Sequence, residues 1–190
     1  MSENQREALI KQILNTQPSL GDFLKEPSLD MVAGSWDMVS YSFQQGFEVL
    51  WDLAHQNGLL LRPLLSIWRQ SIELALKAAI FNIEKSDNRT LNHDLNKLLE
   101  KLITTIKFTT NEGLHLNDDL TKQVHKMIDE IQSYDSFADR FRYPMKRNGK
   151  PHGGIDIDLD KLFMVHWIIV TWCEGITVEL GEEFGIGQPT

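Results

Sequence analysis

The segment LLSIWRQSIELALKAAIFNIEK, residues 64–85, is apolar on most sides when it is wound as an α-helix. Arg62 and Pro63 come directly before it, and proline is tolerated in the first turn of a helix, where its missing N–H group would have no partner anyway. A helix that is apolar all round must be covered by other elements. We therefore predict that this helix begins near Arg62 and lies at the centre of the fold.

Other helices are indicated by apolar residues that recur at helical intervals, such as the stripe formed by Leu95, Leu98 and Leu102. The last apolar segment is long enough to favour a buried helix, although its β-branched residues 168–171 leave a short strand open as an alternative. Helices are predicted over residues 3–14, 30–56, 95–106, 117–134 and 158–183. This pattern is typical of an all-α helical bundle.

The chain of 190 residues, 42% of them hydrophobic, can bury the core of one domain. A proline-containing stretch, QPSLGDFLKEPS, separates the first helix from the rest and makes that helix a candidate appendage. We therefore expect an N-terminal helix and linker over residues 1–28, a helical bundle over 29–185 and a tail over 186–190.

Charge and cysteine content narrow the function classes. A formal net charge of −8 argues against broad attraction to nucleic acid or to an anionic membrane, so local basic clusters matter more than the total. One cysteine, Cys173, cannot form an intramolecular disulfide and is expected to pack in the core, which favours a cytoplasmic location. The N-terminus lacks the pattern of a signal peptide, and the apolar run 162–173 is too short to span a bilayer, so no membrane partner is expected.

Three charged residues lie on one face of the central helix, because Arg69, Glu73 and Lys77 are spaced by four. Isolated charges on a buried helix are costly. Two interpretations follow: the stripe is a structural ladder of ion pairs, or it lines a ligand-binding groove.

His93 and Asp94 stand just before the striped helix, where Asn92 or His93 could act near the cap and Asp94 would favour the positive end of the helix dipole. Capping would explain the NHD sequence. A neutral histidine can also accept a proton, and a nearby arginine such as Arg89 can stabilise developing negative charge. Together these groups supply the chemistry that cleaves RNA at a 2′-hydroxyl.

A long loop after residue 133 contains basic residues beside Phe141 and Tyr143. Arginine contacts with phosphate and stacking of bases on tyrosine would suit RNA or a nucleotide. The alternative is a solvated loop that Phe141 and Tyr143 anchor to the core. The basic residues of this patch are Arg140, Arg142, Lys146, Arg147 and Lys150.

No metal or cofactor site is expected. The run DIDLD, residues 156–160, resembles the opening of a calcium loop, but Lys161 occupies the position of the required glycine, so an acidic helix N-terminus explains it better. The histidines at 115, 125, 152 and 166 lack zinc-type spacing, and no glycine-rich phosphate loop is present.

Three segments follow one another in the order SIELALKAAI, HDLNKLLEKL and DSFADRFRYP. Together they resemble the HEPN superfamily, the higher eukaryote and prokaryote nucleotide-binding helical domains. The resemblance covers roughly residues 64–144. It implies an up-and-down core of four or five helices that commonly forms a homodimer, and a setting in toxin–antitoxin or phage-defence systems or beside a nucleotidyltransferase. Active members resemble metal-independent endoribonucleases, in which an arginine precedes a histidine by a gap of about four to six residues.

In this sequence the family histidine corresponds to His93. Arg89 leaves only residues 90–92 before it, one fewer than the family gap, and Thr90 stands where an amide or acid is usual. The resemblance therefore also accommodates a member that keeps Glu73, Lys77 and His93 without the nuclease arginine.

Our leading hypothesis is an HEPN-like domain that binds RNA or a nucleotide and, if it cleaves RNA, uses His93 as base or acid and Arg89 to stabilise the transition state. Its alternative is a non-enzymatic interaction or regulatory module that binds a protein partner, such as one encoded in a toxin–antitoxin or defence operon. The expected ligand-binding residues are Arg69, Glu73, Lys77, Arg140, Arg142, Tyr143, Lys146 and Arg147.

Overall fold

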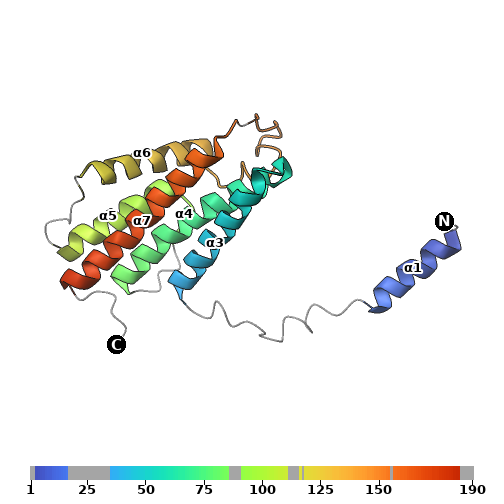
Figure 1. Cartoon of the computed structure of the whole chain (residues 1–190), viewed down its shortest axis with the longest axis horizontal. Coiled ribbons are helices and arrows are strands. Elements are labelled where there is room, and N and C mark those ends of the chain that lie inside the picture. Colours follow the sequence, from blue (N-terminus) through green and yellow to red (C-terminus); the bar gives the residue numbers. More distant parts are fainter. Residues whose placement is uncertain are drawn as a thin grey trace. The chain divides into compact units, whose positions relative to one another are not determined.

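The computed structural model describes residues 3–16, 35–85, 91–110, 116, 118–154 and 156–184. Within these ranges the secondary structure is helical, with one isolated β-bridge between Met145 and Pro151 and no strand, so the predicted all-α bundle is confirmed. The helices are α1 (Glu3–Thr16), α3 (Trp36–Ala54), the 3-10 helix η1 (Gly58–Leu60), α4 (Leu61–Glu84), α5 (Leu95–Thr110), α6 (Asp119–Tyr134) and α7 (Leu159–Phe184) (Figure 1). Helix α1 and the bundle α3–α7 are separate units.

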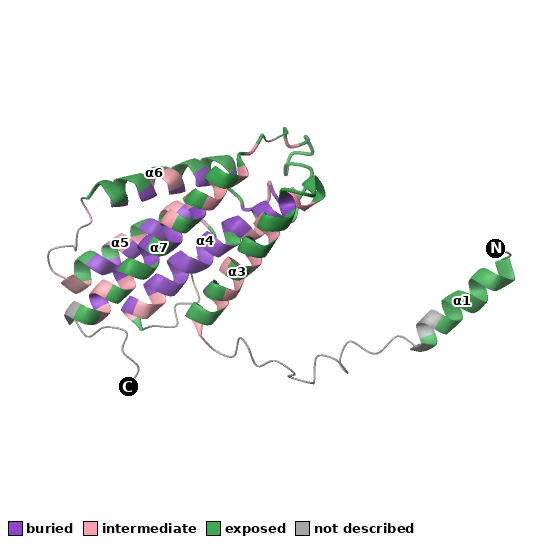
Figure 2. Cartoon of the chain, in the orientation of Figure 1, coloured by how far each residue is buried: buried purple, intermediate pink, exposed green. Residues whose placement is uncertain are grey.

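Helix α4 is the core of the bundle, as its composition predicts. Fifteen of its 24 residues are buried, including Leu64, Ile72, Leu76 and Ile80. It packs against α3, α5 and α7, and the buried residues of the bundle are concentrated along it (Figure 2). Each of the helices α3, α5 and α7 therefore makes its main contact with α4.

Helices α4 and α5 run in the same direction, which departs from the alternation of an up-and-down bundle. Arg69, early in α4, donates a hydrogen bond to the carbonyl of His93 just before α5 (2.7 Å), while Glu84 at the end of α4 accepts one from Thr105 in the middle of α5 (2.8 Å). Helix α4 ends where Lys85 adopts a left-handed conformation (φ 49°). Because α5 runs parallel to α4, His93 just before α5 lies beside the first half of α4 rather than beside its end.

Side-chain caps set two helix starts. The Ser35 hydroxyl accepts the backbone N–H of Met38 (3.4 Å), and its extended conformation places the start of α3 at Trp36, later than the predicted residue 30. Residues 30–34 lie outside the described part of the chain. The Asp118 carboxylate caps α6 by accepting the N–H of Thr121 (2.6 Å), close to the predicted start at residue 117.

Helix α7 is continuous from Leu159 to Phe184, so the open alternative of a short strand at 168–171 is wrong. The Asp158 carboxylate accepts the backbone N–H of Lys161 (3.1 Å), which confirms that the DIDLD run is an acidic helix N-terminus. By length and composition alone α7 could cross a bilayer. This is weak evidence for a membrane span, because the core helix of a bundle can have the same length and composition. One face of α7, with Ile169, Cys173 and Leu180, is buried in the bundle.

His166 of α7 is a buried histidine that the structure keeps neutral. Its Nε2 lies 2.8 Å from the Ser71 hydroxyl, and its ring lies 4.2 Å from that of Phe47. Burial lowers the pKa of His166 from 6.5 to about 4, because the charged imidazolium would lose its hydration.

The buried His166 predicts a specific pH dependence of stability. The unfolded chain binds a proton at this site below about pH 6.5 and the folded chain only near pH 4, so stability falls as pH drops through this window. Between pH 7 and pH 5 the loss from this group is about 2 kcal/mol. Urea unfolding at the two pH values should show it, and His166→Gln, which can still bond to Ser71, should remove most of it. An unchanged pH dependence in the variant would assign the effect to another group.

Candidate functional site

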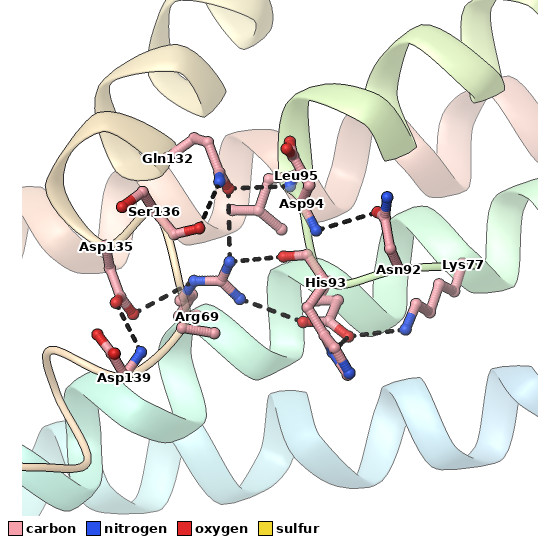
Figure 3. A network of polar contacts seen from close by, with 12 residues as sticks. Arg69, Lys77, Asn92, His93, Asp94, Leu95, Gln132, Asp135, Ser136 and Asp139 are labelled. Atoms are coloured by element: carbon pink, nitrogen blue, oxygen red, sulfur yellow. Dashed lines mark hydrogen bonds and ion pairs between the residues drawn. The ribbon is translucent and has the colours of Figure 1, made fainter. Parts of the chain in front are cut away.

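A chain of buried ion pairs runs along one face of α4 (Figure 3). Arg69 Nη1 lies 3.1 Å from Glu73 Oε2, and Lys77 Nζ lies 2.7 Å from Glu73 Oε1. These residues are 3%, 6% and 7% exposed, so the charges are almost wholly removed from water. The interpretation as a structural ladder of ion pairs is therefore confirmed, while ligand binding by Arg69, Glu73 and Lys77 stays a prediction.

Arg69 joins three parts of the fold. Its Nη2 donates to the carbonyl oxygen of His93 (2.7 Å) and to Gln132 Oε1 at the end of α6 (3.4 Å), and its Nε lies 3.4 Å from Asp135 Oδ2. Gln132 Oε1 also accepts the backbone N–H of Leu95, the first residue of α5 (3.0 Å). The guanidinium thus fixes α4, the start of α5 and the end of α6 relative to one another.

Sequence reasoning missed Gln132 and Asp135. Gln132 continues the apolar face of α6 after Val124 and Ile128, and a polar residue on such a face was the signal that could have identified it. Asp135 accepts the backbone N–H groups of Asp139 (2.8 Å) and Arg140 (2.9 Å), which shapes the loop after α6. No periodicity in the sequence indicated that second role.

Glu73 is the electrostatic centre of the site. Burial by itself raises the pKa of its carboxyl group, but the hydrogen bond and charge of Lys77, followed by those of His93, outweigh burial and hold the pKa below its ordinary value. Glu73 is therefore an ionised carboxylate at neutral pH, and both of its oxygens accept from cationic or polar donors.

His93 is the exposed end of this network. Its Nδ1 lies 2.7 Å from Glu73 Oε1, yet 76% of its side chain is accessible to solvent. An ionised carboxylate accepts hydrogen bonds only, so Nδ1 carries the hydrogen and the neutral ring keeps its lone pair on Nε2. No protein group within the described ranges bonds to Nε2, so this atom is available to take or give a proton.

Helix α5 is capped by Asp94 rather than by Asn92 or His93. The Asp94 carboxylate accepts the N–H of Lys97 (3.2 Å), and the Asn92 side chain accepts the N–H of Asp94 (3.1 Å). The cap therefore leaves the His93 side chain free for its contact with Glu73.

A cavity of about 120 Å³ lies beside His93, and Arg69, Glu73 and Arg142 share its wall. Arg142 Nε donates to the carbonyl of Ala138 (2.6 Å), and Nη2 contacts the same oxygen. Ala138 has a left-handed backbone conformation (φ 55°), which is unusual for a residue other than glycine. The folded loop thereby brings Arg142, predicted from the basic patch, to the predicted histidine.

Three other basic residues of the patch line a second pocket of about 360 Å³, where Arg140, Lys146 and Arg147 lie beside His152; Lys150 does not line it. The Arg140 guanidinium lies 4.5 Å from the centre of the Tyr134 ring, and that of Arg147 lies 4.2 Å from the Phe137 ring. Asp135 lines both this pocket and the cavity beside His93. The two hollows are therefore adjacent, and of the residues predicted to bind a ligand only Lys77 and Tyr143 line neither of them.

The two aromatic residues of the patch have different positions. Phe141 is buried, with its ring 6.5 Å from that of Trp68, so the expectation that it anchors the loop is confirmed. Tyr143 is 56% exposed, so the expectation that it also anchors the loop is wrong, and its ring is accessible for stacking. Its carbonyl oxygen accepts a hydrogen bond from Arg62 (3.2 Å).

The remaining predictions concern Arg89, the other histidines and Cys173. Arg89 and His115 lie outside the described residues. Within the described ranges no group of three histidine, cysteine or carboxylate side chains could hold a metal ion. Cys173 is buried, and burial raises the pKa of its thiol well above the ordinary range, as expected of a packing residue.

Comparison with protein-family models, with curated proteins and with solved structures finds no match to this chain. The resemblance to the HEPN superfamily therefore rests on the three sequence segments alone. Any function proposed for the site rests on the geometry of the site itself.

Proposed function

We propose that this chain is an HEPN-like domain that binds RNA or a nucleotide across the two adjacent hollows, with His93 as its reactive group. The observation that carries the proposal is the contact between the ionised, buried Glu73 and the exposed His93, which leaves Nε2 unpaired on a residue that lines the same cavity as Arg142. Glu73, Lys77 and His93 belong to the segments that resemble the HEPN superfamily, and the contacts of Lys77 and His93 with Glu73 support the proposal.

The site has the groups for cleavage at a ribose 2′-hydroxyl. His93 Nε2 would take the proton of the 2′-hydroxyl as its oxygen attacks phosphorus, or give a proton to the departing 5′-oxygen. Arg142 would stabilise the extra negative charge on the phosphate oxygens, a role that the resemblance assigns to Arg89. A homodimer would bring two such histidines together, one as base and one as acid.

The basic pocket supplies contacts for the neighbouring phosphates. Arg140 and Lys146 supply positive charge beside the ion pair of Arg147 with Asp139 (3.3 Å), although the whole chain carries −8, and such local charge is what a protein needs to bind a polyanion. The exposed ring of Tyr143 can stack on an unpaired base. A cytoplasmic toxin–antitoxin or phage-defence system is the proposed setting.

Charge reversal in the two hollows tests RNA binding. Arg142→Glu and Arg147→Glu should each weaken the binding of a single-stranded RNA about tenfold or more at low salt, and each should reduce the salt dependence of binding. Fluorescence anisotropy at several salt concentrations measures both effects. Lys122→Glu is the matched control, because Lys122 is an exposed lysine at the start of α6, away from both hollows. Equal affinities for all three variants would contradict the proposed surface.

Removal of His93 tests catalysis. If the domain is a nuclease, His93→Ala should lower the rate of RNA cleavage by about 10²- to 10⁴-fold, the usual contribution of a general acid or base. Cleavage of a labelled RNA, with His125→Ala on α6 as the control, measures the rate. RNA that stays intact at high protein concentration, equally with wild type and His93→Ala, would contradict the nuclease activity.

A second candidate function, an interaction module, is favoured by the outer face of α7. Met164, Trp167 and Val178 are each more than half exposed, and Thr171 and Gly175 continue the stripe between them at helical spacing. Large apolar side chains that gather on one exposed face mark an interaction surface. In this view the face binds a second copy of the chain, and the buried polar centre only fixes packing.

The interaction module predicts an oligomer that depends on α7. Trp167→Glu should convert a dimer into a folded monomer in sedimentation velocity, because a charge would be buried without a partner at the interface. Val49→Glu is a suitable control, since Val49 on α3 is equally exposed at 61%. A wild-type chain that is monomeric at high concentration would exclude this interface.

A further inference from the structure

A third, largely apolar pocket lies between the first half of α4, the second half of α6 and the start of α7, away from the buried ion pairs. Its volume is about 300 Å³, at the lower end of the range for small-molecule sites. Leu65, Ile131, Leu162 and Val165 form its apolar wall. Sequence reasoning placed none of these residues in a site.

Trp68 forms part of the wall of this pocket. The residue is only 6% exposed and lines the pocket, and its indole Nε1–H is buried without an acceptor within the described ranges. Because solvent does not reach Nε1, the wall of the pocket is formed by the Trp68 ring and not by its N–H group. The pocket therefore has the apolar wall that is typical of small-molecule sites.

The rim of the pocket carries negative charge. Glu130 of α6 and Asp156 before α7 are exposed at its edge, and neither carboxylate has an ion-pair partner among the residues that the structure describes. The other two charges at the rim neutralise each other, because Lys161 Nζ lies 3.0 Å from Asp158 Oδ2. An occupant of this pocket therefore meets two uncompensated carboxylates.

We propose that this pocket binds a small organic amine, a molecule with an apolar body and one cationic group. The body would displace water from the wall formed by Leu65, Ile131 and Val165, and the ammonium group would lie between Glu130 and Asp156. An anionic ligand of the same size would meet repulsion at the rim. This site is independent of RNA binding, because its carboxylates would repel a phosphate.

Three aromatic probes of similar size test the charge preference: 2-phenylethylamine, neutral 2-phenylethanol and anionic 3-phenylpropionate. The amine should bind about three- to tenfold more tightly than the alcohol, the amount expected for two exposed ion pairs, and the anion more weakly than both. Titration by ¹H–¹⁵N NMR measures each affinity. The indole N–H signal of Trp68, assigned by its loss in Trp68→Phe, should shift during the titration.

Matched variants identify the source of the preference. Glu130→Gln combined with Asp156→Asn should bring the amine to the affinity of the alcohol, while Asp129→Asn, which removes the neighbouring α6 carboxylate outside the pocket, should leave the preference intact. Equal binding of the three probes to the wild type, or a Trp68 signal that does not move, would overturn the proposal. Phe141 is left unchanged because it lines both this pocket and the cavity beside His93.

Discussion

The buried carboxylate of Glu73 is the constraint on which the rest of the site depends. Removal of a carboxylate from water costs several kcal/mol unless donors surround it. Arg69, Lys77 and His93 meet that requirement, and each lies within 3.1 Å of a Glu73 oxygen. Two of these donors come from α4 itself, whereas His93 must come from another segment. The approach of residues 91–95 to the first half of α4 therefore helps to stabilise the buried charge of Glu73.

The same network has a buried part and an exposed part. Arg69 and Lys77 are buried and both pair with Glu73, and Arg69 also bonds to His93 and Gln132, so these contacts hold parts of the fold together. His93 shares the Glu73 carboxylate but keeps most of its ring in solvent. A histidine that is oriented by a buried carboxylate and exposed at its other nitrogen has the arrangement of a general acid or base. A structural role alone would not require that exposure.

The sequence predicts the features of this fold and site that depend on neighbouring residues, but not those that depend on contacts between distant segments. The central position of α4 and the pairing of Arg69 with Glu73 follow from helical periodicity, which is local. The contact of His93 with Glu73 crosses between segments, and the connection between them is long enough for α5 to run in either direction, since extended chain covers about 3.3 Å per residue. The parallel arrangement of α4 and α5 was therefore not predictable. The separation of Arg142 from Arg140 and Arg147 depends on the Asp135 hydrogen bonds and on the left-handed Ala138.

The tautomer of His93 tests the account most directly, because it reports the Glu73 contact on which the proposed chemistry depends. Long-range ¹H–¹⁵N NMR at a pH where the ring is neutral distinguishes a hydrogen on Nδ1 from one on Nε2. The account predicts the Nδ1–H form, with Nε2 unprotonated, and a return toward the mixture of a free histidine in Glu73→Gln. An Nε2–H form in the wild type, or a spectrum that Glu73→Gln does not change, would contradict it.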